Sequence, residues 1–388
     1  MRLDDVRVLD LTRLLPGPYA TQLLADAGAD VVKVEDTGTG DYARHMPPYT
    51  EGGVGAVFDG INRGKRSIAV DLKTEAGREA VLEVASEADV VFEQFRPGVA
   101  ERLGVDYDAV RAVNEDVVYC SLTGFGQDGP HADRAGHDMN YVAMAGLMDV
   151  TRDSRDEKPQ VPGYQIGDLG GGLFAAFSIV GALLSRELGN TGGEYVDVAM
   201  TDVVGSFAQT VAYEALTGGD PAPGETSLTG GGPWYDTYEC ADGRYVTLAA
   251  LEPKFFRAFC EHVGREDLVD AHMTTDDAEK VALREELEGV FAERTRDEWE
   301  ADLGDTESMV APVLTPAEAL TSEQFEARGM VEHGDGAPRL GFPARSTAEP
   351  ESAGGTVPDH GEHTDEVLAE AGYDADAIAA LREEGVVA

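Results

Sequence analysis

The hydrophobic and polar positions of the first 120 residues alternate between two periods. Short runs rich in valine, such as DVVKVE and VVYCSL, have the composition of buried strands, and TEAGREAVLEVASEA between two such runs has the spacing of a helix. Strands that alternate with helices form parallel sheets with helices on both faces. The pattern therefore predicts an α/β, Rossmann-like architecture, with Thr74 as the N-cap of its helix.

The later part of the chain predicts further elements. LGGGLFAAFSIVGALLSREL (169–188) is a long apolar helix that we interpret as buried core, and residues 216–232, rich in Gly, Pro and Thr, indicate a linker. YDTYECADGRYVTLAA places two strand-like runs around Ala-Asp-Gly, which predicts a hairpin. Helical segments follow over about 253–303, and the C-terminal stretch predicts two helices that are separated at Gly372.

The charge of the chain is extreme, since 74 acidic residues face 30 basic ones and the formal net charge is −44. Only six of the basic residues are lysines. Self-repulsion on this scale is screened at molar salt, where the Debye length is about 3 Å. We expect a cytoplasmic protein of a salt-accumulating organism; the alternative is an acidic chain with a basic partner. Nucleic-acid binding is disfavoured because it needs a basic surface.

Other compositional features narrow the class of protein. The hydrophobic fraction of 42% is that of a folded globular chain. No apolar run reaches the roughly 20 residues that a membrane span needs, and the acidic N-terminal stretch has no signal-peptide core. Three cysteines without a CxxC pair argue against a disulfide framework or a structural zinc site. We expect neither a membrane partner nor a bound metal.

Positive charge gathers at the start of the chain. Residues 1–102 hold 12 of the 30 basic residues. Arg63, Lys65 and Arg66 lie within four positions, and Lys73, Arg78, Arg96 and Arg102 follow. Between Gly52 and Val70 the only acid is Asp59. In a chain so rich in acidic residues, a region that is nearly free of them is expected to bind an anion. The preferred anion is a phosphorylated small molecule. The alternative is that these arginines pair with local acids.

A glycine-rich string after one predicted strand resembles a dinucleotide fingerprint without its context. GFGQDG (124–129) matches GxGxxG, but a true fingerprint opens a helix whose first amides hold the pyrophosphate. Pro130 and His131 follow instead, and no amphipathic helix begins there. We therefore interpret the string as a loop and do not expect a nicotinamide cofactor.

Three residues are candidates for acid–base chemistry. His137 lies in AGHDMNY, among small residues, and histidine titrates near neutral pH; the alternative is a structural histidine. Asp168 in QIGDLGGG is expected at the N-cap of the long apolar helix, where its carboxylate would accept amide hydrogen bonds. Glu252 in AALEPKFF lies between a predicted strand and a predicted helix, and Glu-Pro is also a common first-turn composition.

The three glycines after Asp168 carry an energetic cost. Glycine in a helix costs about 1 kcal/mol relative to alanine, so three of them suggest that something approaches the backbone closely. A helix start without side chains could also hydrogen-bond a developing oxyanion through its amides. We expect this helix start to hold such an oxyanion.

The strings RPGVAERLG, SLTGFGQDGP, AGHDMNY, GDLGGG, GGPWYDTYECADGRY and LEPKFF together resemble the α-methylacyl-CoA racemases of the family III CoA-transferase superfamily. The resemblance runs over about residues 4–385. It implies a Rossmann-like large domain over 1–198, a linker over 199–234 and a small α+β domain over 235–325. Residues 326–388 would be a linker and a C-terminal segment that returns to the large domain, and two subunits would interlock as a homodimer.

By this resemblance His137 and Asp168 fall on the catalytic histidine and aspartate of the family. Glu252 falls on the glutamate that pairs with the histidine and that the partner subunit supplies. The resemblance also implies the positions that contact the acyl-CoA substrate: Val70, Asp71, Leu72, Lys73, Gln94, Phe95, Arg96, Arg102, Gly136, Asp138, Met139, Asn140, Tyr141 and Tyr235. The chain departs from some relatives at Tyr164, where they carry asparagine, and at Asp36, where they carry arginine.

The predicted reaction is the inversion of the α-carbon of a 2-methylacyl-CoA thioester. The α-proton is weakly acidic, and a racemase needs one proton-transfer group on each face of the carbon. His137 and Asp168 would serve the two faces, with Glu252 holding the tautomer of the histidine. No metal, nicotinamide or flavin is expected. The alternatives are a CoA-transferase, in which Asp168 forms an acyl anhydride, and a non-catalytic acidic scaffold or binding module.

Overall fold

The computed structural model describes residues 2–333, 337–348, 350 and 355–388. Two compact units are present: the first contains Met1–Ala145, Gly163–Phe207 and Ala327–Ala388, and the second contains Gly146–Pro162 and Ala208–Glu326. The first unit is thus built from both ends of the chain. The span 235–325, expected as a small domain, falls within the second unit, which also takes up residues 146–162 and 208–234.

A six-stranded parallel sheet forms the centre of the first unit. Its strand order is β3-β2-β1-β4-β5-β6, so the direction in which the sheet grows reverses between β1 and β4. Apart from the edge strand β6, the strands are nearly all buried because both of their faces are covered, which is why they read as apolar runs in the sequence. The strands are β1 (Arg7–Asp10), β2 (Asp30–Glu35), β3 (Arg66–Ala69), β4 (Val90–Glu93), β5 (Val118–Thr123) and β6 (Glu194–Ala199).

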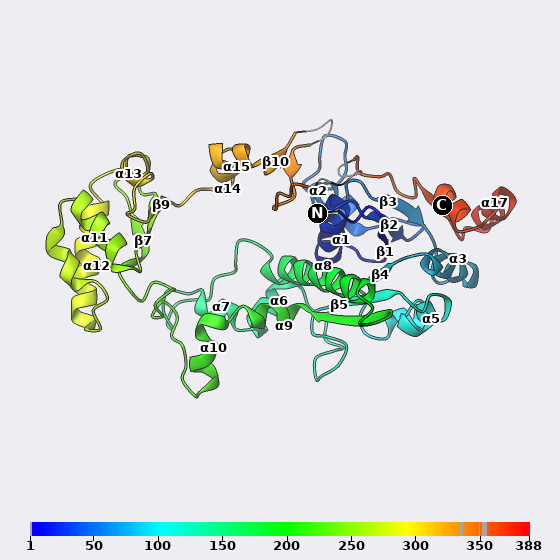
Figure 1. The fold of residues 1–388 in the computed structure, drawn as a ribbon, viewed down its shortest axis with the longest axis horizontal. Coiled ribbons are helices and arrows are strands. Elements are labelled where there is room, and N and C mark those ends of the chain that lie inside the picture. Colours follow the sequence, from blue (N-terminus) through cyan, green and yellow to red (C-terminus); the bar gives the residue numbers. More distant parts are fainter. Residues whose placement is uncertain (1, 334–336, 349, 351–354) are drawn as a thin grey trace. The chain divides into compact units, whose positions relative to one another are not determined.

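Helices cover both faces of this sheet (Figure 1). On one face Val8, Val31 and Val90 pack in a core with α1 (Pro16–Asp26), α8 (Ile166–Glu187) and α9 (Met200–Ser206). On the other face Leu9, Val32 and Val91 pack in a core with the remaining long helices of this unit, which are α3 (Glu75–Ser86), α5 (Tyr107–Val113), α16 (Thr364–Glu370) and α17 (Ala375–Glu383). The expected α/β, Rossmann-like architecture is confirmed.

Helix α8 is only partly core. One face packs against α1 and α9, as expected for a buried helix, but the opposite face leaves Leu173, Phe177 and Leu184 more than half exposed. The interpretation of the whole helix as buried was therefore wrong for that face. By length and composition, α8 is the one helix among the described residues that could cross a membrane. Core helices of soluble proteins also meet these two criteria.

The remaining elements of the first unit are short connections. They are η1 (Tyr42–His45), α2 (Ala56–Ile61), α4 (Val99–Leu103), α6 (Asp138–Met144), and the two-stranded pair β10 (Val331–Glu332) and β11 (Arg339–Leu340). As predicted, Thr74 caps α3, since its side chain accepts a hydrogen bond from the Gly77 amide. The GFGQDG string lies in the loop between β5 and α6 and opens no helix, as expected.

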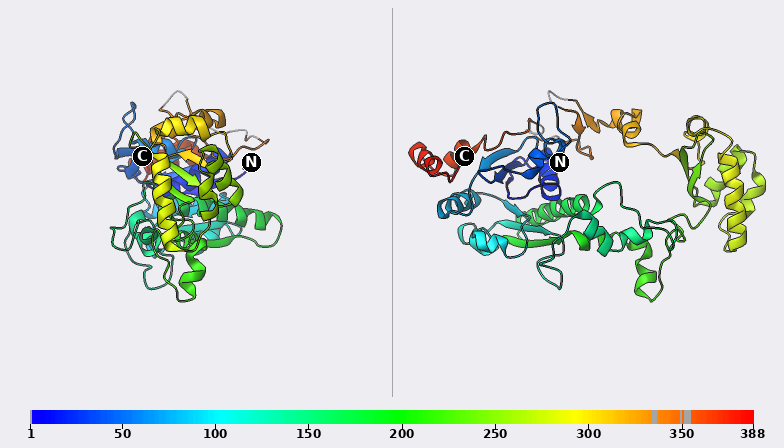
Figure 2. Two further views of the ribbon diagram at one scale, coloured as in Figure 1. Left: turned by 90° about the vertical axis from the view of Figure 1, so that its left-hand side faces the viewer. Right: turned by 180° about the vertical axis from the view of Figure 1, so that it is seen from behind.

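The second unit is built around a three-stranded antiparallel sheet in the order β7-β8-β9 (Figures 1 and 2). The predicted hairpin is confirmed as β7 and β8, joined by a turn in which Gly243 has the left-handed φ of 73°. Aromatic residues including Phe256, Phe291 and Trp299 fill its core. The elements are α7 (Leu147–Val150), α10 (Gln209–Leu216), β7 (Tyr235–Glu239), β8 (Tyr245–Ala249), α11 (Pro253–His262), η2 (Glu266–Ala271), α12 (Asp277–Phe291), α13 (Arg296–Leu303), β9 (Val310–Pro312), α14 (Pro316–Leu320) and, at the boundary with the first unit, α15 (Glu323–Arg328).

Candidate active site

A cavity of about 540 Å³ lies at the carboxyl ends of β1, β2 and β3. Open parallel sheets bind ligands at this edge, near the point where the strand order reverses. The cavity walls come mainly from the loop after β1, the loop between β2 and η1, and the loop after β3, and the segment after β4 adds Phe95 and Leu103. Five of the expected CoA contacts lie on these walls, namely Val70, Asp71, Leu72, Lys73 and Phe95.

The charged groups on the cavity walls differ in whether they are already paired. Glu35 and Asp41 are buried and form ion pairs with Arg44 and Lys33 behind the wall. Asp36, the residue that departs from some relatives, is exposed, and its carboxylate accepts hydrogen bonds from the amides of its own loop, Gly38 and Thr39. Arg13 and Lys73, by contrast, have no ion-pair partner among the described residues. The cavity therefore presents two available cations.

This surplus of positive charge extends beyond the cavity. In a chain with a net charge of −44, most cations are paired, yet Arg96 and Arg102 after β4 also lack a carboxylate partner within the part of the chain that the structure describes. Because β1, β3 and β4 are parallel, the residues that follow them gather at one edge of the sheet. That edge is suited to an anionic ligand with more than one charged group.

The basic cluster predicted from the sequence has a different role. Arg63 pairs with Asp26 at 2.6 Å, Arg66 pairs with Asp30 at 2.5 Å, and Lys65 is fully buried. The Lys65 ammonium donates to the Thr21 hydroxyl at 2.7 Å. The expectation that these three residues meet an anion was wrong. Acids pair with the two arginines, as in the alternative, but these acids, Asp26 and Asp30, are distant in the sequence and not local.

The other expected contacts after β4 lie in several places. Gln94 accepts a hydrogen bond from the Gly17 amide at the start of α1, at 3.0 Å. Arg96 lines a second cavity of about 380 Å³, together with Glu93, whose pKa burial raises to about 7. Arg102 is exposed on α4 and lines neither cavity.

His137 and Asp168 lie at the starts of two helices, α6 and α8, that are tied together. His137 is the exposed N-cap of α6, and the next residue, Asp138, reaches the first turn of α8. The Asp138 Oδ1 atom accepts hydrogen bonds from the Gly167 amide at 2.7 Å and from the Asp168 amide at 3.0 Å. The two predicted proton carriers are thus held on neighbouring helix starts by one carboxylate.

These contacts correct two expectations for the start of α8. Asp168 is the third residue of the helix and Gln165 is its N-cap, so the capping carboxylate is that of Asp138. The amides of Ile166 and Leu169 are also occupied, by the carbonyl oxygens of Tyr164 and Gln165. The expected oxyanion site at this helix start is therefore wrong, because its amides already have partners.

The glycines after Asp168 serve close helix packing. A Cβ atom on Gly171 would lie 2.5 Å from the Met200 side chain of α9, and one on Gly172 would lie 2.4 Å from the Pro16 carbonyl oxygen. Such distances are incompatible with any larger residue. The expectation that something approaches this backbone was correct, and the approaching groups belong to the neighbouring helices α9 and α1.

The electrostatic environment of Asp168 suits proton transfer. Its carboxylate is half-buried, and burial is the largest cause that raises its pKa to about 7, with the negative charge of Asp138 as the second cause. A carboxyl group that titrates near neutral pH can both take up and give back a proton under ordinary conditions. Groups with such shifted pKa values gather at functional sites.

The remaining predicted residues of this region shape the turn before α6. Tyr141 is buried, its hydroxyl donates to the Gly136 carbonyl at 2.6 Å, and its ring leaves no room for a Cβ on Gly136. The Asn140 side chain accepts a hydrogen bond from the His137 amide at 3.0 Å. Met139 is exposed. These residues fix the backbone that carries His137.

Two predicted site residues belong to the second unit. Glu252 is exposed at the N-cap of α11, and Tyr235 is the first residue of β7 and is half-buried. Their relation to His137 and Asp168 stays a prediction. Tyr164, the other departure from some relatives, is exposed just before α8, where its carbonyl oxygen accepts the Ile166 amide.

Comparison with known proteins identifies the family. The family model of "CoA-transferase family III" matches residues 3–364. The chain belongs to that family. It is 37% identical to the succinyl-CoA:mesaconate CoA-transferase of Haloarcula marismortui, over 96% of this chain and 97% of that protein. It is 32% identical to the human alpha-methylacyl-CoA racemase, over 100% of this chain and 98% of that protein.

A solved structure has the same fold. The crystal structure of a CaiB/BaiF family protein from Brucella suis matches with a TM-score of 0.82 at 34% identity, and the match covers 95% of this chain and 99% of that chain. The family III relatives thus include both racemases and CoA-transferases. The chain is an enzyme of the family III CoA-transferase superfamily, as expected from the resemblance.

Sequence reasoning missed two contributions to the site. Arg13 was not singled out, although it is a cation directly after the end of a predicted strand, which is the position where ligands meet a parallel sheet. Asp138 was expected to contact the substrate, but its role as the cap of α8 was missed. Its carboxylate accepts hydrogen bonds from the amides of Gly167 and Asp168, which lie 29 and 30 residues later in the sequence. No local pattern in the sequence signals that second role.

Proposed function

We propose that the chain is a racemase that inverts the α-carbon of a 2-methylacyl-CoA thioester. One group removes the α-proton to give an enolate, and a second group delivers a proton to the opposite face. His137 and Asp168 take these two roles. The reaction moves a proton and changes no oxidation state, so the proposal includes no metal, nicotinamide or flavin.

The observation that carries this proposal is the environment of Asp168. Its pKa of about 7 lets it act as a base for one enantiomer and, once protonated, as an acid for the other. His137 is the second proton-transfer group, since histidine is the side chain most often used for acid–base catalysis, and Asp138 holds the two helix starts together. A nucleophilic carboxylate would instead be favoured by a low pKa, because attack needs the ionised form.

The proposal assigns CoA to the edge of the sheet. CoA carries several phosphate charges, and the unpaired cations Arg13, Lys73 and Arg96 supply positive charge at that edge. The acidic residues on the walls of the larger cavity add little repulsion toward a phosphate. Glu35 and Asp41 form ion pairs inside the protein, and the Asp36 carboxylate accepts a hydrogen bond from an amide of its own loop. The nature of the acyl chain is left open.

We further propose an interlocked homodimer in which Glu252 of one subunit orients His137 of the other. The exposed apolar residues of α8, which include Leu173, Phe177 and Leu184, support self-association, because an exposed apolar helix face is typical of an interface. Phe177→Glu should therefore convert the dimer into monomers in light scattering. Val113→Glu on α5, also an exposed apolar position, is the matched control. A dimer that survives Phe177→Glu would exclude this face from the interface.

The proposed setting is the cytoplasm of a salt-accumulating organism, without a nucleic-acid or membrane partner. The acid excess supports it, because a net charge of −44 is tolerated best where salt screens repulsion. Negative charge of this size also opposes binding to phosphate backbones.

A second candidate function is CoA transfer between carboxylic acids. The similarity to CoA-transferases from Haloarcula marismortui and Agrobacterium fabrum favours it. In this reaction the Asp168 carboxylate attacks the thioester carbonyl, a mixed anhydride forms and the CoA thiolate leaves. The thiolate then attacks the Asp168 carbonyl of the anhydride, which releases the donor acid and leaves an aspartyl-CoA thioester. The carboxylate of the acceptor acid attacks this thioester, expels the thiolate and forms a second mixed anhydride. Attack of the thiolate on the acceptor's own carbonyl releases the new acyl-CoA and restores the Asp168 carboxylate.

One experiment separates the two functions. The protein is incubated in deuterated water at molar potassium chloride with each pure enantiomer of a 2-methylacyl-CoA, and separately with succinyl-CoA and mesaconate. A racemase incorporates deuterium at the α-carbon and inverts it without an acceptor acid. A transferase produces mesaconyl-CoA and leaves the α-hydrogen in place.

Variants test the assignment of Asp168. Asp168→Asn should abolish either reaction, whereas Asp202→Asn, a matched change in the first turn of α9, should leave it intact. If neither substrate set reacts with the unmodified protein, both proposed functions are overturned.

A further inference from the structure

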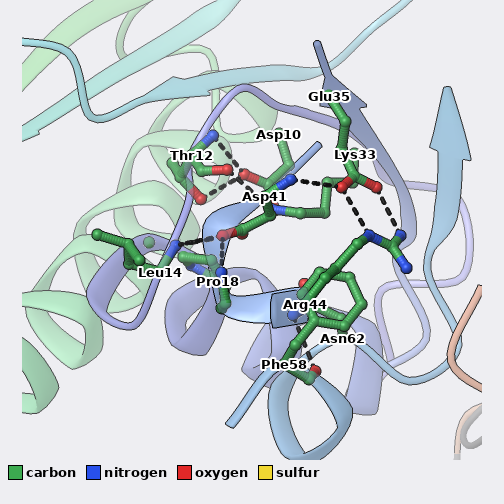
Figure 3. Close-up of polar contacts among 12 residues, drawn as sticks. Asp10, Thr12, Leu14, Pro18, Lys33, Glu35, Asp41, Arg44, Phe58 and Asn62 are labelled. Atoms are coloured by element: carbon green, nitrogen blue, oxygen red, sulfur yellow. Dashed lines mark hydrogen bonds and ion pairs between the residues drawn. The ribbon is translucent and has the colours of Figure 1, made fainter. Parts of the chain in front are cut away.

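A buried ion pair, whose residues are drawn in Figure 3, joins the wall of the larger cavity to strand β2, because Asp41 lines the cavity and Lys33 does not. The Lys33 ammonium lies 3.0 Å from Asp41 Oδ2, and both side chains are almost fully excluded from solvent. Lys33 belongs to β2, and Asp41 to the loop between β2 and η1. A pair of buried charges is seldom a source of net stability, since desolvation offsets the attraction. The contribution of this ion pair to the protein therefore depends on which backbone groups it holds in place.

The pair holds both residues that flank Arg13. The Lys33 ammonium donates to the Thr12 carbonyl oxygen at 2.8 Å. The Leu14 amide donates to Asp41 Oδ1 at 3.0 Å and to Oδ2 at 3.1 Å. Arg13 thus lies between two backbone groups that are fixed by one ion pair. Figure 3 shows Leu14, Asp41 and Lys33 joined in this way.

The backbone at this point is strained, which shows that the contacts impose a conformation. Leu14 has a φ of 66°, in the left-handed region that a residue with a side chain seldom adopts. Such strain persists only where the surroundings hold it. The two hydrogen bonds to Asp41 supply that constraint, and the resulting turn carries Arg13 onto the cavity wall, where its guanidinium lies 5.3 Å from the centre of the Tyr42 ring.

The charges around the pair are balanced. Asp10, Glu35 and Asp41 face Lys33, Lys65 and Arg44, and all six are buried. Glu35 accepts from the Asp41 amide at 2.8 Å, so the second ion pair, between Glu35 and Arg44, fixes the same loop. Each carboxylate is engaged inside the protein, and the Arg13 guanidinium at the cavity has none of them as its partner.

We propose that Arg13 binds a phosphate group of the substrate in this cavity and that Lys33 and Asp41 are the positioning residues that present it. The proposal rests on the proposed function, because it takes acyl-CoA as the ligand. Its phosphates are the anions that an unpaired guanidinium recognises through paired hydrogen bonds. The arginine thereby supplies, from the loop after β1, a positive charge on the wall of a cavity that Asp36 also lines.

The test measures CoA binding by titration calorimetry at molar salt. Arg13→Gln should raise the Kd about tenfold, as expected for the loss of a hydrogen-bonded charge. The charge-balanced double variant Lys33→Met/Asp41→Ala should raise it by a similar factor. Adding Arg13→Gln to the double variant should then change the Kd by less than about twofold, because residues that act through one contact are not additive. In turnover, KM should rise while kcat stays within about threefold of the unmodified enzyme.

Two controls are matched to these changes. Arg111→Gln removes an arginine that also lies over a tyrosine ring, at 5.8 Å from the centre of Tyr107, and that lines neither cavity. Arg63→Met removes a buried cation that lies outside this cluster of charges and whose ion-pair partners are Asp26 and Glu332. Both should leave the Kd for CoA unchanged at temperatures where the variants are folded.

Each outcome decides a different statement. If the unmodified protein does not bind CoA, the proposed function falls and the proposal falls with it. If it binds CoA and Arg13→Gln binds equally well, the role of Arg13 is overturned while the proposed function stands. If only the double variant binds like the unmodified protein, the positioning role is overturned. If the double variant does not fold, the Kd of Asp41→Asn is measured instead. This variant removes the negative charge that pairs with Lys33 and keeps one oxygen that can accept the Leu14 amide. An unchanged Kd overturns the positioning role of the ion pair.

Discussion

The carboxylate of Asp138 accepts a hydrogen bond from the backbone amide of Asp168 at 3.0 Å and places a negative charge beside the Asp168 side chain. One residue therefore does two things at the site. It caps the start of α8, and it adds to the effect of burial in raising the pKa of Asp168. The residue next to the candidate catalytic histidine thus influences the protonation of the candidate catalytic aspartate.

Asp138→Asn should lower the pKa of Asp168. The asparagine oxygen can still accept the two amide hydrogen bonds, but the repulsive charge is gone. For the enantiomer whose proton Asp168 removes, kcat/KM rises with pH through this pKa, so the midpoint of that rise should move to lower pH. It should stay above the ordinary value for aspartate, because burial is the larger cause. Asp133→Asn, on the exposed loop before His137, is the control. A midpoint that does not move would show that the charge of Asp138 does not affect the pKa of Asp168.

Much of the large unit could be predicted from the sequence because its signals are local. Strand β2 was predicted with its observed bounds, since DVVKVE is rich in valine and is followed by turn-forming residues. Thr74 was identified as a cap because its partner, Gly77, is three residues away. Signals that act within one turn of a helix, or along one strand, can be read without a structure.

The parts that could not be predicted depend on contacts between distant residues. The cluster of Arg63, Lys65 and Arg66 appeared free of acids along the sequence, but Asp26 and Asp30 reach two of its members from other elements. The cap of α8 was assigned to Asp168 because the nearest acid is the natural candidate, whereas Asp138 comes from 30 residues earlier. Charge pairing and capping across the fold need the folded chain.

Asp168→Asn should stabilise the folded protein at pH 8 and have little effect at pH 4. The folded-state pKa of about 7 lies above the ordinary value of 3.8, so the folded chain keeps a proton that the unfolded chain releases between these values. This contribution is fully present below the ordinary pKa and is lost as pH rises through the folded one. The neutral asparagine avoids that loss. Thermal melting of both proteins at pH 4, 6 and 8 measures the difference, with Asp202→Asn as the control. Equal melting temperatures at all three values would contradict the raised pKa.

The melting temperature should rise steeply with salt. A chain with 44 surplus negative charges repels itself, and the repulsion is screened as the Debye length falls from about 10 Å at 0.1 M to about 3 Å at 1 M. We expect a higher melting temperature, and retained activity, at 2 M potassium chloride than at 0.1 M. Sucrose at matched osmolality, which is excluded from protein surfaces without screening charge, separates screening from general stabilisation. A melting temperature that is the same at both salt concentrations would contradict the interpretation of the acid excess as an adaptation to salt.

The two proton carriers should be separable by the enantiomer that each serves. A group that faces one side of the α-carbon exchanges only the proton on that side. His137→Ala should therefore abolish racemisation yet retain deuterium exchange with one enantiomer of a 2-methylacyl-CoA, through Asp168, and Asp168→Ala should retain exchange only with the opposite enantiomer. Both variants are assayed with both pure enantiomers by mass spectrometry, with His131→Ala, an exposed histidine of the preceding loop, as the control. A CoA-transferase gives another pattern, because there Asp168→Ala abolishes every reaction and His137→Ala leaves acyl transfer largely intact. Racemisation that persists in His137→Ala would exclude the two-base assignment, since one carboxyl group on one face cannot by itself return the proton to the other.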